Sequence, residues 1–225
     1  MLIIVPAYNE EESIKSTVDK IIETSNFDYV VINDGSLDTT KQVLENNNFN
    51  HLDLPINLGI GGAMQTGYLY ALNNNYDYAV QLDADGQHNP NDLESLYDEI
   101  EKTEYDMVIG SRFVEKSAYK GSLSRRIGIY YFFYFIKALT GIEVTDPTSG
   151  YRIVNRKVIK EFCDFYPSDY PEVEVLVNLA NKNYLIKEIK VEMNQRMGGK
   201  SSITPKRSIY YMLKVSYISL IRSLF

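Results

Sequence analysis

Two aspartates, Asp83 and Asp85, stand one residue apart in the stretch QLDADGQH, directly after a run of residues that is typical of a buried strand. Aspartate and glycine are common in turns for backbone reasons alone, which explains one aspartate well and two less well. A D-x-D pair offers two carboxylates to a hard divalent cation, whose coordination substrate phosphates commonly complete. We therefore expect Asp83 and Asp85 to bind a metal, with Gln87 adding a neutral oxygen.

A glycine-rich stretch, NLGIGG, opens a segment with helical character. Its glycines allow close approach of the backbone, and a helix N-terminus there would favour an anion or the edge of a nucleotide. The sequence has neither the G-x-G-x-x-G order of dinucleotide-binding folds nor a P-loop, so both are disfavoured. Together with the paired acids, this stretch suggests a nucleoside diphosphate carried by an activated substrate.

The elements that must position these residues follow a regular order. Short apolar runs alternate with longer amphipathic segments, which is typical of an α/β fold with helices around a mostly parallel sheet. We predict strands at 2–7, 28–34, 51–55, 76–86 and 105–112, and helices at 10–25, 35–47, 57–75 and 89–102. The alternation stops near residue 112, which divides the chain into halves of 1–112 and 113–203, followed by an amphipathic helix at 204–225.

Polar residues end four of the predicted strands, in the stretches PAYNE, NDGS, DADGQ and GSR. In open parallel sheets, ligands bind outside the carboxyl ends of the strands. We therefore expect these four stretches to converge on one rim and to form a site there.

The composition narrows the class of protein. With 225 residues, of which 44% are hydrophobic, the chain is long enough to bury a sizeable core. A formal net charge of −7 argues against a nucleic-acid partner, which would require a basic face. The single cysteine, Cys163, excludes an internal disulfide and a cysteine-based zinc cluster, and it fits a reducing compartment.

The sequence also bears on membranes. No stretch reaches the roughly 20 apolar residues that span a bilayer, and the first residues lack the basic region of a secretory signal. Tyrosine-rich clusters at 130–135 and 209–217 could dock at a lipid interface, pack against the sheet or meet a dimer partner. We expect a cytoplasmic protein; a peripheral contact with the inner face of the membrane and a homodimer both stay open.

Six stretches follow one another in the order and spacing of a known family: VPAYNEEESI, VINDGSLDTT, NLGIGGAMQTG, LDADGQHNP, VIGSR and DPTSGYR. Over about residues 1–200 the chain resembles the family 2 glycosyltransferases, particularly dolichyl- and polyprenyl-phosphate sugar synthases and small bacterial polysaccharide transferases. The resemblance implies a single GT-A domain over 1–225, with a Rossmann-like nucleotide-binding half and an acceptor-binding half.

The resemblance also implies an activity. The family transfers a sugar, with inversion at the anomeric carbon, from a nucleotide diphosphate sugar and uses Mg²⁺ or Mn²⁺ as cofactor. The donor would be UDP-, GDP- or dTDP-linked, and the acceptor a glycan or a polyprenyl-linked molecule in cell-surface polysaccharide or glycolipid biosynthesis.

The donor site follows residue by residue from the resemblance. It comprises Pro6, Ala7, Tyr8, Glu10, Asp34, Gly59, Gly62, Asp83, Ala84, Asp85, Arg112, Arg196 and Lys200. Asn33 stands where the family usually has the first acid of an Asp-Asp pair, which leaves the role of this position open. Asp83, Asp85 and Gln87 would hold the metal, and contact of Asp83 with the ribose or sugar is the alternative.

Basic residues of the second half are candidates for the diphosphate or an anionic acceptor, because guanidinium groups pair well with phosphate oxygens. Arg125 and Arg126 are candidates by type, whereas Arg112 and Arg196 also match the family. The stretch MGGKSS resembles a loop that closes over the donor, with Lys200 facing phosphate.

A hydroxyl acceptor needs a carboxylate base opposite the leaving diphosphate. Asp146, Glu172 and Glu174 are available, and we favour Glu172, although both glutamates also suit the start of a helix near Pro171. A polyprenyl phosphate is already ionised and needs no base. Two other classes compete: a nucleotidyltransferase, for which no basic phosphate-binding signature is seen near the N-terminus, and a non-catalytic nucleotide- or sugar-binding scaffold.

Overall fold

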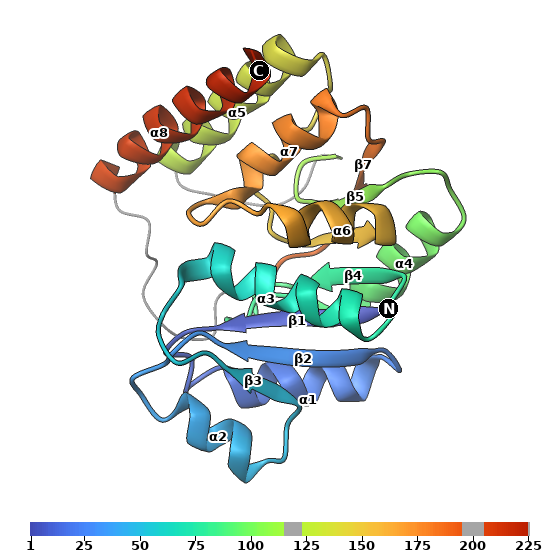
Figure 1. Cartoon of the computed structure of the whole chain (residues 1–225), viewed down its shortest axis with the longest axis vertical. Helices are drawn as coiled ribbons and strands as arrows, with labels where there is room; N and C mark the ends of the chain where they lie inside the picture. The colour runs from blue at the N-terminus through green and yellow to red at the C-terminus, as the bar shows by residue number, and fades with distance from the viewer. Residues whose placement is uncertain (115–122, 195–204, 225) are drawn as a thin grey trace.

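A seven-stranded sheet forms the centre of the molecule, in the strand order β3-β2-β1-β4-β6-β5-β7 (Figure 1). The computed structural model describes the backbone of residues 1–114, 123–194 and 205–224, and the side chains of 1–114, 126–194 and 212–221. The strands are β1 (Leu2–Ala7), β2 (Asp28–Asn33), β3 (His51–Asp53), β4 (Tyr78–Gln81), β5 (Met107–Ser111), β6 (Arg152–Asn155) and β7 (Ile186–Lys190). Strand β6 runs antiparallel to both neighbours, and the other pairs are parallel. The predicted single, mostly parallel sheet is confirmed.

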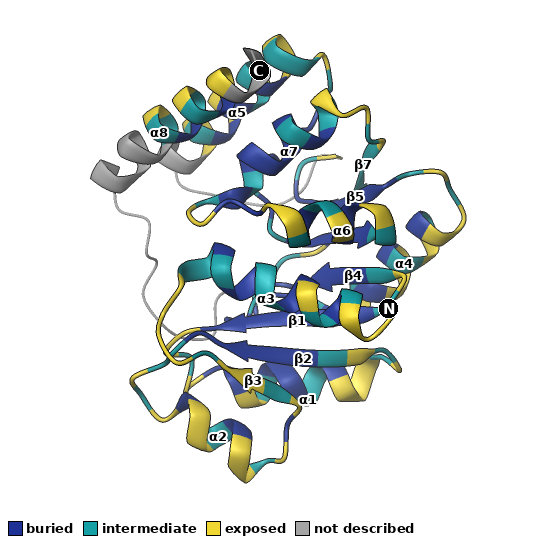
Figure 2. Ribbon diagram, in the orientation of Figure 1, coloured by how far each residue is buried: buried dark blue, intermediate teal, exposed yellow. Residues whose placement is uncertain are grey.

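Helices cover both faces of this sheet. They are α1 (Ile14–Thr24), α2 (Thr40–Asn46), α3 (Gly59–Asn73), α4 (Leu93–Glu101), α5 (Leu123–Thr140), α6 (Arg156–Asp164), α7 (Pro171–Asn181) and α8 (Pro205–Leu224), with a 3₁₀ turn at Pro90–Asp92. Strand β1 is buried along its whole length, and its consecutive residues Ile3 and Ile4 belong to two different core clusters. One cluster packs under α1 and α4, and the other under α3, α5, α6 and α7. Figure 2 shows β1 and most of β2 buried, whereas β3 and β7 at the ends of the sheet order and the outer helix faces are intermediate or exposed.

The two halves of the chain share this sheet, because β6 from the second half lies between β4 and β5 from the first. In the β5–β6 register Ile109 pairs with Arg152, and in the β4–β6 register Tyr78 pairs with Asn155. Since β6 is antiparallel, its first residue, Arg152, lies at the edge where β4 and β5 end. The stretch DPTSGYR is thereby delivered to the same edge as the carboxyl ends of the parallel strands.

The observed first residues of two helices can be compared with the predicted ones. Helix α1 begins at Ile14 rather than at residue 10, because Asn9 adopts a left-handed conformation with φ +56° and residues 11–13 form a turn. Helix α7 begins at Pro171 as predicted, a favourable first helical position for proline. None of the described helices is both long enough and apolar enough to cross a membrane.

Candidate active site

The polar strand ends converge as the sequence predicts. Strands β1, β2, β4 and β5 point the same way, so PAYNE, NDGS, DADGQ and GSR all follow strands at one edge of the sheet. The amino end of β6 adds the stretch DPTSGYR to this edge. We call this edge the rim.

The paired acids lie on one turn of the rim. The side chain of Asp83 is 36% exposed, and its Oδ1 accepts a hydrogen bond of 2.9 Å from Nε2 of Gln81. Asp85 is buried, and its Oδ1 accepts the backbone N–H of Gln87 at 3.0 Å. The carbonyl of Ala84, between them, accepts the hydroxyl of Thr17 at 2.9 Å, which fixes the turn to α1. Two carboxylates are thus held on one anchored turn, and oxygen ligands of this kind suit Mg²⁺ or Mn²⁺.

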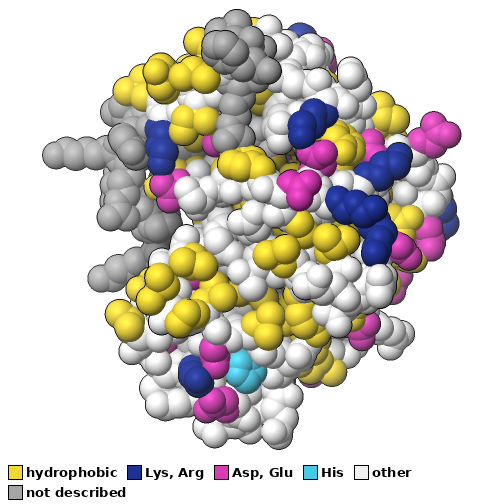
Figure 3. Space-filling model, viewed as in Figure 1, with side chains coloured by type: hydrophobic (Ala, Val, Ile, Leu, Met, Phe, Trp, Pro, Cys, Tyr) yellow, Lys and Arg dark blue, Asp and Glu magenta, His cyan; other side chains and the backbone are white. Residues whose placement is uncertain are grey.

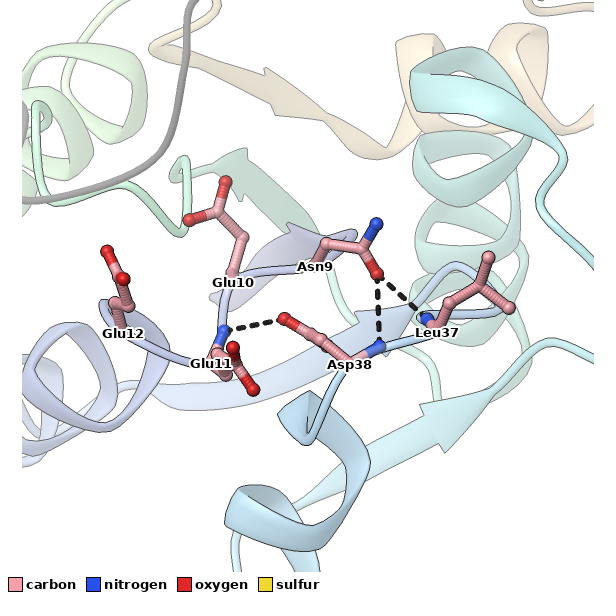
Figure 4. Close-up of a pocket in the computed structure, with 6 residues that line it drawn as sticks. All are labelled: Asn9, Glu10, Glu11, Glu12, Leu37 and Asp38. Atoms are coloured by element: carbon pink, nitrogen blue, oxygen red, sulfur yellow. Dashed lines mark hydrogen bonds between the residues drawn. The ribbon is translucent and has the colours of Figure 1, made fainter.

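The end of β1 is tied to the end of β2. Oδ1 of Asn9 accepts the N–H groups of Leu37 and Asp38, and the N–H of Glu11 donates to Oδ2 of Asp38 (Figure 4). Glu10 donates its N–H to Thr40 at 2.8 Å. Of the other predicted residues here, Pro6 and Ala7 are buried, whereas Tyr8 is exposed.

These two loops enclose a hollow of about 390 Å³. It is lined by Asn9, Glu10, Glu11, Glu12, Leu37 and Asp38 (Figure 4). Four of the six side chains are acidic, so the hollow is a poor place for a diphosphate. Hydrogen bonds among Asn9, Glu11, Leu37 and Asp38, which line the hollow, join the two loops.

Asp34 links the end of β2 to the start of α3. Its Oδ1 accepts the N–H of Leu58 at 2.7 Å. Burial raises the pKa of the Asp34 carboxyl, and hydrogen bonds from the backbone of Leu58 and Gly59 oppose this rise. Asn33 donates its amide to Oδ1 of Asp53 at 2.7 Å. An aspartate at position 33 would place a second carboxylate against that of Asp53 and lose this hydrogen bond.

The predicted glycines serve different purposes at the start of α3. Gly59 has φ +78°, a conformation that favours glycine. A Cβ atom on Gly62 would overlap Leu58 of the same turn. The sequence reasoning missed Gly61, whose N–H donates to the carbonyl of Ser168 at 3.1 Å and whose Cβ would overlap the carbonyl of Pro167. Because Pro167 and Ser168 are over 100 positions away in the chain, no local signal could have identified this contact.

Arg112 and Asp146 form a buried ion pair. Nε of Arg112 donates to Oδ2 of Asp146 at 2.6 Å, and its NH2 donates to Oδ1 at 2.7 Å. Asp146 is 0% exposed and Arg112 only 6%. Glu188 accepts the N–H groups of Thr145 and Asp146, which holds the loop in place. This geometry favours a structural role for the pair over Asp146 as base or Arg112 as a free phosphate ligand.

The two glutamates of α7 differ in their surroundings. Glu174 is 4% exposed, whereas Glu172 is half-buried. Burial raises the pKa of Glu172, the positive charge of Arg152 opposes this rise, and the negative charge of Asp83 adds to it. The charge of Glu172 therefore interacts with that of Asp83, one of the two paired acids of the rim.

Arg152 is a further residue that the sequence reasoning passed over. Its guanidinium donates to three backbone carbonyls, those of Pro147, Ser149 and Glu172, at 2.7 to 2.9 Å. It thereby joins the DPTSGYR stretch to the start of α7. The stretch itself was a signal, but its arginine could not be assigned without knowing that β6 is antiparallel.

Several predicted residues are not placed. Arg196 and Lys200 lie outside the described residues, as does the side chain of Arg125, and Arg126 is exposed on α5. Among the described residues, the one group of three potential metal ligands is Glu45, His51 and Asp53. It lies at β3, at the far end of the sheet order, where the ammonium of Lys41 is 2.9 Å from Asp53. The ammonium of Lys41 thus supplies the positive charge that a metal ion would otherwise bring to Asp53.

Three comparisons with known proteins bear on this site. A family model described as glycosyl transferase family 2 matches residues 2–163. An uncharacterized protein of Methanocaldococcus jannaschii is 33% identical over 195 residues, which cover 85% of this chain and 80% of that protein. The UDP-N-acetylglucosamine–dolichyl-phosphate N-acetylglucosaminyltransferase of Methanococcus voltae is 31% identical, covering 94% of this chain and 93% of that enzyme.

A more distant relative is the polyprenol monophosphomannose synthase of Mycolicibacterium smegmatis, which is 25% identical and covers 96% of this chain and 85% of that enzyme. Among solved structures, glucosyl-3-phosphoglycerate synthase from Mycobacterium tuberculosis, in complex with Mn²⁺, UDP and phosphoglyceric acid, superposes with a TM-score of 0.75. It is 18% identical and covers 99% of this chain and 77% of that chain, so it supports the fold. The chain therefore belongs to glycosyl transferase family 2 and is a glycosyltransferase with the GT-A fold.

Proposed function

We propose that this glycosyltransferase moves a sugar, with inversion, from a nucleoside diphosphate sugar to a polyprenyl phosphate. The observation that carries the proposal is the placement of Asp83 and Asp85 on one anchored turn of the rim. Ligands of open parallel sheets bind at this edge. The relatives support the acceptor, because those of M. voltae and M. smegmatis are named for dolichyl phosphate and polyprenol monophosphomannose.

A divalent cation, Mg²⁺ or Mn²⁺, fits the side chains of the turn. Asp83, Asp85 and Gln87 offer oxygens, and substrate phosphates and water would complete the coordination. When bound, such an ion supplies positive charge against the charge that develops on the departing diphosphate. The chain's own part is to hold the donor between this turn and the ends of β1 and β2, where Asp34 fixes the start of α3.

The acids of the second half bear on the choice of acceptor. Asp146 is engaged by Arg112 and Glu174 is buried, whereas Glu172 is half-buried. Its raised pKa would suit a base that deprotonates a sugar hydroxyl, which is the competing proposal. A phosphate acceptor arrives ionised, and Glu172 would then orient the site.

An apolar surface supports an acceptor that resides in a membrane. We define the α5–α8 face by its exposed side chains, which are Ile127, Tyr130, Tyr131, Tyr134, Leu213, Tyr217, Leu220 and Ile221. The two helices are side by side (Figure 1), and the hydroxyls of Tyr131 and Ser216 are 2.9 Å apart. Figure 3 shows hydrophobic side chains at the upper left, where these helices lie in Figure 1. Exposed tyrosines with apolar neighbours suit the interface of a bilayer. Flotation with vesicles tests this contact, and light scattering tests the alternative that two copies pair through the face.

The first experiment is a thermal-shift screen against UDP, GDP and dTDP and their sugars, with and without Mn²⁺. A nucleotide at about 100 times its Kd adds about 2.7 kcal/mol to the stability of the folded state, which is readily seen as a rise in melting temperature. Metal-dependent stabilisation by one nucleotide would identify the donor. Absence of any shift, together with absence of binding by calorimetry, would favour the scaffold.

Matched variants then test the metal turn. Asp85→Asn keeps an oxygen that can accept the N–H of Gln87, so the turn can persist while the negative charge is lost. We expect transfer to be abolished. Asp19→Asn, at an exposed position paired with Lys15 on α1, is the control and should leave transfer unchanged. Near-normal transfer by Asp85→Asn at saturating Mn²⁺ would contradict the assignment.

Glu172→Gln distinguishes the two acceptors. With a hydroxyl acceptor and chemistry rate-limiting, losing the base should cost about 10² to 10⁴ in rate, whereas a phosphate acceptor predicts a loss of under about threefold. The exposed Glu101→Gln is the control. Polyprenyl phosphate, phosphoglycerate and a glycan should be offered in parallel, and turnover only with the hydroxyl acceptors would reject the proposed one.

A further inference from the structure

Both ring nitrogens of His88 face one residue, Asp83. The histidine is 3% exposed, and its Nδ1 accepts the backbone N–H of Asp83 at 3.0 Å. Its Nε2 lies 3.6 Å from Oδ2 of the same aspartate. Because Nδ1 accepts a hydrogen bond, the proton of the neutral ring is on Nε2, the side that faces the carboxylate.

The plane of the His88 ring is fixed from outside the turn. The ring stacks on Tyr151, with centroids 4.6 Å apart and an angle of 11° between the planes. The hydroxyl of Tyr151 donates to the carbonyl of Asn89 at 2.9 Å. The backbone of His88 also forms a β-bridge with Met193, just beyond β7. The ring of His88 is thus held by the residue that precedes β6, and its backbone by the segment after β7.

The other oxygen of Asp83 is held as well. Oδ1 accepts from Gln81, which precedes the turn by two residues. A Cβ atom on Gly150 would lie 2.7 Å from Nε2 of Gln81 and 3.7 Å from Oδ1 of Asp83, so a larger residue there would crowd this hydrogen bond. One carboxylate oxygen therefore faces Gln81, and the other faces His88.

We propose that His88 is a positioning residue, which holds the Asp83 carboxylate in the orientation that binds the metal and diphosphate of the donor. The inference rests on the proposed function, since it concerns the same acids. Asp83 is 36% exposed, and an exposed carboxylate samples several rotamers unless neighbours restrict it. Partners that orient a metal ligand typically change metal affinity or activity by about 10- to 100-fold when removed.

Two substitutions separate the ring from its nitrogens. His88→Phe keeps an aromatic ring for Tyr151 to stack on and removes both nitrogens. His88→Asn offers an amide oxygen near the place of Nδ1, which can accept the N–H of Asp83, but has no group at Nε2. We expect the larger loss from His88→Phe and a partial recovery in His88→Asn.

The other histidine of the chain provides a matched control. Nε2 of His51 lies 3.8 Å from a carboxylate oxygen of Asp53, and its Nδ1 is 2.8 Å from the carbonyl of Phe49. The distance to the carboxylate is similar to that of His88, but Nδ1 of His51 faces an acceptor rather than a donor, and β3 is at the end of the sheet order. We expect His51→Phe to leave metal binding at the rim unchanged.

The measurement is a titration with Mn²⁺, followed by the electron paramagnetic resonance of the free aqua ion, with saturating UDP present. Calorimetry of UDP without metal and a melting curve accompany it for each variant. We expect His88→Phe to weaken Mn²⁺ binding by about 10- to 100-fold while metal-free UDP affinity is kept. His88→Asn should bind Mn²⁺ more tightly than His88→Phe and so recover part of the loss.

The outcomes separate this inference from the proposed function. Mn²⁺ binding by His88→Phe within about twofold of the unmodified protein would overturn the role of His88 alone. An equal loss of metal-free UDP affinity would assign His88 to general support of the fold and would also overturn it. If His88→Phe does not fold, unchanged Mn²⁺ binding by His88→Asn, which lacks Nε2, rejects the inference. Failure of the unmodified protein to bind Mn²⁺ with UDP would overturn the proposed function and this inference together.

Discussion

Replacing Asp146 by asparagine tests whether this acid stabilises the fold or acts on the acceptor. The asparagine keeps the size of the side chain and one oxygen but leaves the Arg112 guanidinium, 6% exposed, without the carboxylate that engages it through two hydrogen bonds. Removing one partner of a buried ion pair costs about 3–5 kcal/mol. For a chain of this size, that corresponds to a fall in melting temperature of about 6 to 20 °C.

Urea denaturation provides the assay. The chain has 19 tyrosines and no tryptophan, so circular dichroism and tyrosine fluorescence are suitable probes. The double variant Arg112→Met/Asp146→Leu removes both charges, and it should recover much of the lost stability because no uncompensated charge remains. The asparagine variant should still bind nucleotide well below its melting temperature.

Two results would refute this reasoning. A loss of free energy of unfolding below about 1 kcal/mol would mean that the ion pair contributes as little as an exposed pair. A loss of transfer by more than about 10²-fold with stability retained would indicate that Asp146 acts as the base, in the range expected for a general base.

Three further predictions follow from packing and charge. Gly61→Ala should cost about 1–3 kcal/mol because its Cβ overlaps the Pro167 carbonyl, whereas Gly128→Ala, with nothing within 4 Å, should be neutral or stabilising in melting curves. The raised pKa of Glu172 means that ionising it opposes folding, so stability falls as pH rises from the ordinary to the raised pKa. Glu172→Gln escapes this loss, and its melting temperature should exceed that of the unmodified protein more at pH 8 than at pH 4. Asn33→Asp removes the donor to Asp53 and should cost about 1–3 kcal/mol at pH 7, less at pH 4, in denaturation curves.

The first half of the fold could be predicted because its signals are local. Buried strands such as β1 are short apolar runs, and α1 and α4 carry their own amphipathic spacing. Parallel strands joined by helices then fix the direction of every carboxyl end. The convergence of the polar stretches on the rim followed from this direction, without any knowledge of side-chain contacts.

The second half could not be predicted in the same way because its contacts are distant. Strand β6 has only four residues. Its partners β4 and β5 come much earlier in the chain, and even the end of β5, Ser111, is 41 positions before the start of β6, Arg152. Nothing in DPTSGYR indicates that Asp146 contacts Arg112, so Asp146 stayed a candidate base although Glu172 was favoured. His88 stands in the same stretch as the paired acids, DADGQH, but the sequence does not indicate that Tyr151 stacks on its ring.

The charges on the rim explain why donor and metal belong together in the proposal. Asp83 and Asp85 carry negative charge, and Glu172 interacts with Asp83. Two arginines of the same edge are engaged already, Arg112 by a carboxylate and Arg152 by three carbonyls. In the described part of the chain, a diphosphate therefore meets carboxylates, and a cation between them would remove the repulsion.

This arrangement makes donor and metal binding reciprocal, since each must raise the affinity of the other by the same factor. A side chain that orients Asp83 then acts on both affinities through their coupling, whereas a side chain that supports only the nucleotide acts on UDP even without metal. The roles of Asp83, Asp85 and His88 are therefore assigned by two affinities measured for each variant, that for Mn²⁺ in the presence of UDP and that for UDP without metal. Transfer rates alone combine the two and cannot separate them.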